Sequence, residues 1–261
     1  MSDHYDFFQA ARAGDIGTLR ALLAGGAPLD AVDHRGRTVL WCAAEYGQEL
    51  AVEFLLARGA DPLRDRQLGF SPLREAVQTG RGSLVAALVR YGGVEKDDLN
   101  SIPDLLYFCA LHGDVEAVRV LLDMGANPQG GTADWRFAPM SGAATAGSVE
   151  VIELLAERGA PVQPEHDRAW TPLHSAAINA RAEAIARLIA LGADPRRQNG
   201  EGLTAGQLIE RRLLTSSFDR EEALASKQAF DKAAREQGLP YPGRSALQFL
   251  RERFEARRRS S

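Results

Sequence analysis

The sequence has little cysteine and little lysine. Among its 261 residues only Cys42 and Cys109 are cysteines, and both lie in apolar stretches of helical character. We therefore expect two small buried side chains in a reducing compartment, which favours a cytoplasmic protein. Arginine outnumbers lysine 28 to 3. That bias is typical of GC-rich genomes and favours a bacterial source.

Long apolar runs are also missing. No window approaches about 18 consecutive apolar residues, so we expect no transmembrane helix. The opening residues, MSDHYDFFQAARAGD, contain no basic stretch followed by an apolar core, and they predict no secretory signal. The net charge of −4 gives no global basic footprint for nucleic acid. The composition is that of an ordinary soluble globular protein.

The common catalytic motifs are absent. The chain contains no G-x-x-x-x-G-K-[ST], H-E-x-x-H, G-x-S-x-G or C-x-x-C pattern. The stretch TGRGS, Thr79–Ser83, has glycines but no following lysine, and we interpret it as the turn between two helices. The five histidines are spread along the chain and predict no shared metal site. We expect no enzyme, no cofactor, no metal ion and no small-molecule substrate.

What the sequence does contain is a repeat. Glycines that end apolar segments recur at Gly26, Gly59, Gly93, Gly125, Gly159 and Gly192, at steps of 32 to 34 residues. With Gly92 in place of Gly93, all steps are 33 except one of 34. A pair of small residues recurs in the same register, at Ala10-Ala11, Ala43-Ala44, Ala76-Val77, Cys109-Ala110, Ala143-Ala144 and Ala176-Ala177. A period of 33 residues predicts small units that must stack, because one unit cannot bury its apolar face alone.

The residue types within one unit predict two helices joined by a turn. Small paired residues let neighbouring helices approach closely, and the stretch VEAVRVLLDMG forms one apolar helix face. Asp15, Asp114 and Ser148 precede second helices and are predicted to cap their free N–H groups. The repeated glycines fit left-handed C-caps.

These residues carry a family resemblance. TPLHSAA, Thr171–Ala177, followed by a Gly-Ala-Asp stop, resembles the ankyrin repeat, whose pattern includes T-P-L-H-x-A at a period of 33 residues. TVLWCAA at Thr38–Ala44 and SPLREAV at Ser71–Val77 are weaker copies. The resemblance implies an all-α fold, an ankyrin-repeat solenoid of about six to seven helix-turn-helix units with a C-terminal helical cap. The expected stack covers residues 1–213, with units at about 5–36, 37–69, 70–102, 103–136, 137–169 and 170–202 and a degenerate unit at 203–213.

Two regions depart from the pattern. The third unit ends YGGVEKDDLNSIPD and the fourth opens PDLLYFCA, so the geometry of the loop around residues 93–103 stays open. After about Leu214 the repeat stops. Residues 219–236 predict one longer helix, and SALQFLRERFEARRR predicts a last short one. We interpret residues 214–261 as a polar cap for the stack.

The resemblance also implies a concave face, built from loop tips and first helices, that binds a protein partner. Register selects the residue before each Thr-Pro-like pair and the exposed end of each first helix. Large rings at such positions are typical binding anchors, although they could also pack between loops. The predicted partner-binding residues are Arg37, Tyr46, Phe70, Gln78, His112, Trp135, Phe137 and Trp170. We interpret Trp41 and Tyr107 as packing residues.

The leading functional hypothesis is a non-enzymatic, monomeric scaffold that binds a protein partner whose identity the sequence does not give. One alternative is an inhibitor or immunity-type protein that occludes one specific partner. Another is nucleic-acid binding through the Arg-rich C-terminal tail, which the interleaved Glu252 and Glu255 and the acidic body disfavour.

Overall fold

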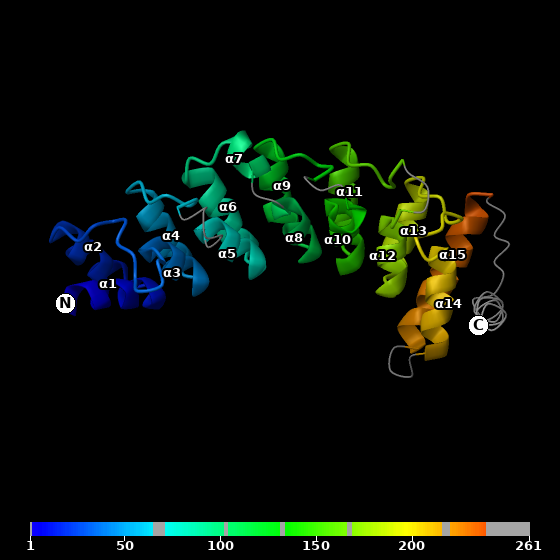
Figure 1. The fold of residues 1–261 in the computed structure, drawn as a ribbon, viewed down its shortest axis with the longest axis horizontal. Coiled ribbons are helices and arrows are strands. Elements are labelled where there is room, and N and C mark those ends of the chain that lie inside the picture. Colours follow the sequence, from blue (N-terminus) through cyan, green and yellow to red (C-terminus); the bar gives the residue numbers. More distant parts are fainter. Residues whose placement is uncertain are drawn as a thin grey trace, which may run out of the picture. The chain divides into compact units, whose positions relative to one another are not determined.

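The computed structural model describes residues 2–64, 71–101, 104–130, 134–165, 169–215 and 220–238. Within these ranges the fold is all-helical, as expected, and contains no β-strand beyond two isolated bridges. The chain divides into two compact units, residues 1–109 with 114–127 and residues 110–113 with 128–261. Each unit is built from helix pairs (Figure 1).

In the first unit, the first helices of successive repeats pack side by side, and the second helices form a parallel row (Figure 1). The first helices are α1 (Ser2–Ala13), α3 (Val39–Glu45) and α5 (Pro72–Gln78); the second helices are α2 (Ile16–Ala24), α4 (Glu49–Leu56), α6 (Gly82–Tyr91) and α9 (Val115–Asp123). α8 (Leu105–Leu111) runs from the first unit into the second.

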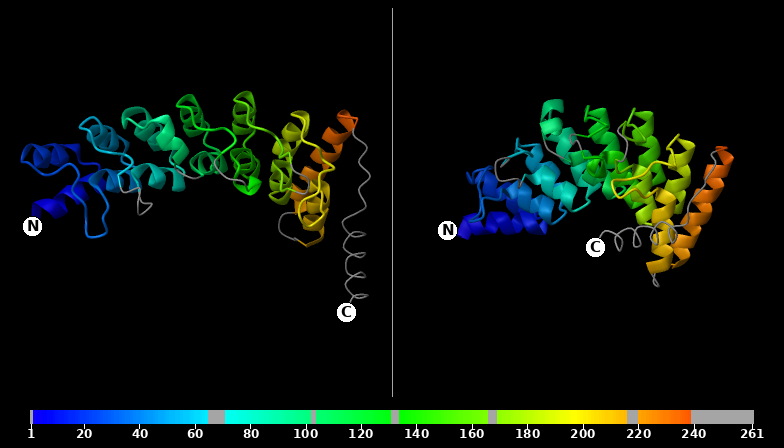
Figure 2. Two further views of the ribbon diagram at one scale, coloured as in Figure 1. Left: turned by 45° about the horizontal axis from the view of Figure 1, so that its top comes forward. Right: turned by 45° about the vertical axis from the view of Figure 1, so that its right-hand side comes forward.

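The second unit has the same kind of internal arrangement. Its elements are a short 3-10 helix η1 (Trp135–Phe137), α10 (Pro139–Ala146), α11 (Val149–Glu157), α12 (Pro172–Ile178), α13 (Ala182–Ala190), α14 (Ala205–Thr215) and α15 (Arg220–Glu236). The predicted longer helix at 219–236 is thus observed as α15, which packs against α13 and α14 (Figure 2). The predicted last helix lies outside the described residues.

The small paired residues meet their expected role. Every member of the six pairs is buried, with at most 5% of its surface exposed, and this absence of bulk lets the first helices pack closely. The predicted caps are confirmed as well. The side chains of Asp15, Asp114 and Ser148 accept hydrogen bonds from the backbone N–H groups of Thr18, Ala117 and Val151 at 3.0, 3.0 and 3.4 Å.

The repeated glycines adopt the left-handed conformation that the pattern predicts, with φ between +65° and +97° at Gly26, Gly59, Gly93, Gly125, Gly159 and Gly192. Gly92 has a φ of −88°, so Gly93 is the glycine in register. Only glycine adopts positive φ without a Cβ penalty, which explains why the helix ends recur at this residue.

The irregular third repeat contains an additional helix, α7 (Lys96–Ser101). Its Leu99 side chain is buried, and the Asn100 side-chain oxygen accepts a hydrogen bond from the backbone N–H of Asn127 at 3.0 Å. The Lys96 side chain lies against Gly125. The segment around residues 93–103 is therefore packed onto the end of α9 as far as it is described.

Candidate protein-binding surfaces

Residues 32–38 of the first unit, here called the first finger, form a hairpin-like turn before α3. Val32 and Thr38 make an antiparallel bridge. The Asp33 N–H donates to the Arg37 carbonyl at 2.9 Å, and Gly36 supports the turn with a φ of +76°. The Asp33 carboxylate accepts hydrogen bonds from the backbone N–H groups of Arg35 and Arg37 at 2.8 and 3.0 Å. The finger is thus held by one side chain at its base.

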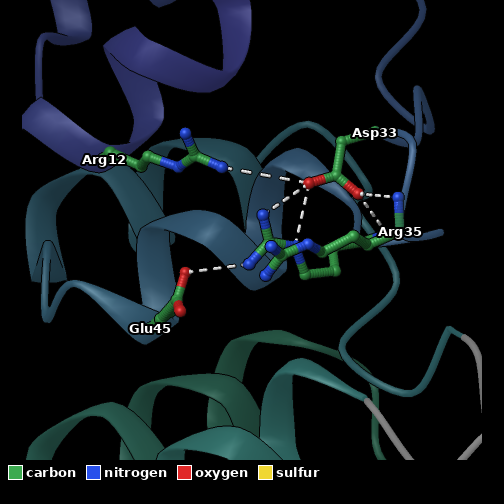
Figure 3. Close-up of polar contacts among 5 residues, drawn as sticks. Arg12, Asp33, Arg35 and Glu45 are labelled. Atoms are coloured by element: carbon green, nitrogen blue, oxygen red, sulfur yellow. Dashed lines mark hydrogen bonds and ion pairs between the residues drawn. The ribbon is translucent and has the colours of Figure 1, made fainter.

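Arg37 joins the first finger to α3. Its Nε donates to Asp33 Oδ2 at 2.8 Å, its second nitrogen lies 2.7 Å from the same oxygen, and its third lies 3.5 Å from Glu45 Oε2 (Figure 3). The guanidinium carbon stands 4.7 Å from the centre of the Trp41 ring. Burial works to raise the pKa of the Asp33 carboxyl, but the hydrogen bonds from Arg37 and Arg35 outweigh it and the pKa is lowered. Because only 12% of its side chain is exposed, Arg37 mainly shapes the finger.

Arg12 links this network to the exposed end of α3. One of its terminal nitrogens lies 3.9 Å from Asp33 Oδ2 (Figure 3), and its guanidinium carbon is 5.9 Å from the centre of the Tyr46 ring. Its Nε is shielded from solvent and has no hydrogen-bond partner among the residues that the structure describes. Tyr46 is 53% exposed. A half-exposed ring therefore sits beside a guanidinium whose hydrogen-bonding capacity is incompletely used.

The neighbouring helix continues this surface. α3 and α5 pack together, and Gln78 occupies on α5 the position that Glu45 has on α3; Gln78 is exposed, as predicted. Burial raises the pKa of the nearby Glu75, and the charge of Glu45 acts in the same direction. We call Arg12, His34, Arg35, Tyr46 and Gln78 the first-unit surface.

The second unit presents its own set of side chains. Phe137 is 44% exposed at the end of η1, which lies against α10 and α12. Arg136 forms a two-pronged ion pair with Asp134 and stands 6.0 Å from the Phe137 ring centre. Ile178 is 38% exposed, and His112 is also exposed. We call His112, Phe137, Trp170 and Ile178 the second-unit surface.

Trp170 divides its contacts between interior and solvent. Its indole N–H donates to the Ser175 hydroxyl at 2.8 Å, and its ring centre is 5.6 Å from that of His174. The side chain is half-buried. Part of its ring therefore packs within its own repeat, and its role as a binding anchor stays a prediction.

The residue before each Thr-Pro-like pair does not have a constant environment. Arg37 is mostly buried, Leu203 is 1% exposed and Phe137 is 44% exposed. Phe70 lies outside the described residues, as does the side chain of Trp135, whose backbone forms η1. One continuous patch of these aromatics therefore stays a prediction. Trp41, interpreted as a packing residue, is confirmed as one at 6% exposure.

Sequence reasoning missed Arg12 and Asp33. A signal existed, because the pattern of Asp33, Gly36 and Thr38 recurs as Asn199, Gly202 and Thr204. In the described ranges, no three His, Cys, Asp or Glu side chains cluster so that they could hold a metal ion. Nor does any helix there combine the length and apolar character needed to cross a bilayer. The two cysteines are free and buried, and burial raises the pKa of Cys42 to about 11.

Stacked helix pairs at a period near 33 residues define a helical-repeat protein. A family model for ankyrin repeats in three copies matches residues 7–101 and again 106–199. The chain therefore belongs to the ankyrin repeat family. The crystal structure of the human ASB11 ankyrin repeat domain has the same fold, with a TM-score of 0.69 at 25% identity, over 87% of this chain and 96% of that one.

Curated relatives match through parts of much longer proteins. The human transient receptor potential cation channel subfamily A member 1 is 30% identical over 63% of this chain and 16% of its own length. The L-asparaginase of Dirofilaria immitis is 35% identical over 45% of this chain and 20% of its own. The probable E3 ubiquitin-protein ligase XBOS32 of Oryza sativa is 29% identical over 70% and 37%. The chain thus spans well under half of these relatives' lengths. Ankyrin repeats are generally protein–protein interaction modules, and their fold is typically non-enzymatic.

Proposed function

We propose that this chain is a non-enzymatic scaffold that binds a protein partner through the loop and first-helix surface of its repeats. The observation that carries the proposal is the exposure of large side chains at the ends of first helices and in the loop before α10. Tyr46 and Gln78 are exposed on the first-unit surface, and His112 and Phe137 on the second. Stacking of the repeats does not require these side chains, and rings such as Tyr46 bury much area at low entropic cost.

Supporting features agree with a monomeric scaffold in the cytoplasm. Both cysteines are free and buried, which suits a reducing compartment. The small paired residues are buried between helices of the stack, so they are not available for contact with a second copy of the chain. The narrower alternative, an inhibitor or immunity-type protein that occludes one partner, uses the same surfaces. It differs in stoichiometry, because it requires one dominant partner at a one-to-one ratio.

Affinity purification followed by mass spectrometry tests the proposal. The wild-type chain should capture a protein partner, and Tyr46→Ala or Phe137→Ala should weaken that capture. Truncating a central anchor costs about 2 kcal/mol of binding, roughly thirtyfold in affinity. Both side chains are about half exposed, so the free energy of unfolding should change by only about 0.5 kcal/mol.

Leu50→Ala is the matched control. Leu50 is 68% exposed at the start of α4, in the row of second helices. Its truncation removes a comparable exposed apolar side chain away from the proposed surface and should leave the affinity unchanged. Equal loss of capture in all three variants, or no captured protein with the wild type, would contradict the proposal.

A further inference from the structure

The chain contains two fingers with nearly the same backbone but different tips. The second finger, residues 198–204, pairs Gln198 with Thr204 as the first pairs Val32 with Thr38. Asn199 occupies the position of Asp33, and its side-chain oxygen accepts from the backbone N–H groups of Glu201 and Leu203 at 2.9 and 3.0 Å. Gly202 and Gly36 share a φ of +76°. The turn therefore needs only a side-chain oxygen at its base, which either Asp or Asn supplies.

The tips carry opposite charge. The first finger exposes His34 and Arg35, whereas the second exposes Glu201 at the position of Arg35. The Arg35 side chain makes no hydrogen bond or ion pair with another described residue. Glu201, in contrast, is paired with Arg211 of α14 at 3.1 Å. Turn geometry demands neither charge, so the cation of the first finger is available for another purpose.

The first finger is a basic spot on an acidic unit. Residues 1–109 and 114–127 contain 12 Lys and Arg against 18 Asp and Glu. Within the finger the balance reverses, because residues 32–38 contain Arg35 and Arg37 against the single carboxylate of Asp33. Arg12 approaches the same carboxylate (Figure 3), and Arg37 also lies near Glu45. A local excess of positive charge on an otherwise negative surface attracts a negatively charged group of a partner and orients it.

Apolar surface adjoins these cations. Val32 in the finger is 44% exposed, and Tyr46, which shares the Arg12 guanidinium with Asp33, is 53% exposed. Resting on the proposed scaffold function, we infer that the first finger, with Arg12 and Tyr46, binds an acidic segment of the partner protein that carries a large apolar side chain. Arg35 and Arg12 contact the carboxylates of that segment, and Tyr46 packs against its apolar side chain.

Asp33 limits the strength of this site. Its carboxylate is the anion that Arg37 holds and that Arg12 approaches. Asp33→Asn keeps the oxygen that Asn199 uses in the second finger, so the turn should remain. The change removes one negative charge from the site, and both guanidiniums then have more capacity for an incoming carboxylate.

The test uses the full chain and a random peptide library displayed on phage. Selection on the wild type should enrich peptides rich in Asp and Glu with an aromatic or large aliphatic residue. One enriched peptide, labelled and measured by fluorescence anisotropy, should bind Arg35→Glu about tenfold more weakly and Asp33→Asn more tightly. The affinity should fall as salt rises from about 50 to 300 mM.

Arg119→Glu on α9 is the matched control, because it makes the same change in net charge at another exposed arginine of the same unit. It should leave peptide affinity within about twofold of the wild type. Enrichment of basic or neutral peptides, no enrichment at all, or equal weakening by Arg35→Glu and Arg119→Glu would each overturn the inference. A captured partner that depends on Tyr46 or Phe137 but not on Arg35 would do the same while leaving the scaffold function intact. Failure to capture any partner would instead refute the scaffold function.

Discussion

At the residue scale, His174 illustrates a polar side chain that serves structure. It is 1% exposed, and its Nδ1 accepts from the backbone N–H of Thr171 at 3.2 Å while Nε2 lies 3.0 Å from the Leu203 carbonyl oxygen. The Thr171 hydroxyl accepts in return from the His174 N–H, which completes a capping box at the start of α12. Burial lowers the pKa of His174 to about 4, so the ring is neutral in the folded protein at neutral pH.

This lowered pKa predicts acid sensitivity. Because the unfolded chain protonates this histidine below about pH 6.5 and the folded chain does not, His174 stabilises the fold fully above that pH. The contribution is lost as the pH falls from about 6.5 toward 4, by up to about 1.4 kcal/mol per pH unit. The equivalent position one repeat later, Gln207, shows which variant can serve as a control. Its side-chain oxygen accepts a hydrogen bond from the Thr204 N–H at 2.9 Å, as His174 Nδ1 accepts one from the Thr171 N–H. Thermal unfolding between pH 7 and 5 should therefore shift less in His174→Gln than in the wild type, and equal shifts would contradict this assignment.

Residue patterns predicted the backbone far better than the contacts at the binding surfaces. The positive φ of Gly59 or Gly159 follows from local rules, since any helix that ends there needs a residue without a Cβ. The contact of Arg12 with Asp33 and Tyr46 depends on how two repeats pack, and no local rule contains it. The exposure of Phe137 beside the burial of Leu203 has the same origin. Register gives the position of a side chain along the stack but not the neighbour that covers it.

At the element scale, packing explains which departures from the repeat are tolerated. TGRGS is predicted to be the turn between two helices; residues 79–81 form that turn, and Gly82 and Ser83 already belong to α6. The Asp114 carboxylate lies so close to Gly82 that a Cβ there would overlap it. α7 could not be predicted because the repeat pattern fails in its segment. Its contacts include the hydrogen bond between Asn100 and Asn127, a residue of the following repeat.

α15 is the element that covers α13 and α14, and its sequence resembles no repeat. Phe230 is fully buried on it, and Ala223 and Ala234 are buried with it. We expect Phe230→Ala to lower the free energy of unfolding by about 3–5 kcal/mol. Leu224→Ala on the same helix, where Leu224 is 50% exposed, should cost about 0.5 kcal/mol. Urea denaturation of both variants measures the difference. Similar small costs would show that α15 does not cap the stack in solution, and the chain ending at Leu214 should then be as stable and soluble as the full protein.

At the scale of the whole molecule, charge is distributed unevenly along the chain. Residues 1–202 carry 19 Lys and Arg against 27 Asp and Glu, whereas residues 203–261 carry 12 against 8. Five arginines stand near the C-terminus, outside the described residues, at Arg251, Arg253, Arg257, Arg258 and Arg259. A basic end on an acidic body raises the question of whether the molecule uses this end for nucleic acid.

Electrostatics argues for weak binding at most. Each phosphate contact contributes a slope of about −0.9 to the dependence of log affinity on log salt, so five arginines would give at most about −4.5. The net charge of the body repels the same phosphates, and Glu252 and Glu255 lie between the arginines. We expect a labelled DNA duplex or RNA to bind the full chain more weakly than about 1 μM at about 150 mM salt. Deletion of residues 239–261 should abolish what binding remains at about 50 mM salt while leaving partner capture intact, because the proposed surfaces lie in the repeats. Submicromolar binding at the higher salt, lost on the same deletion, would make the tail a nucleic-acid site and displace the scaffold reading.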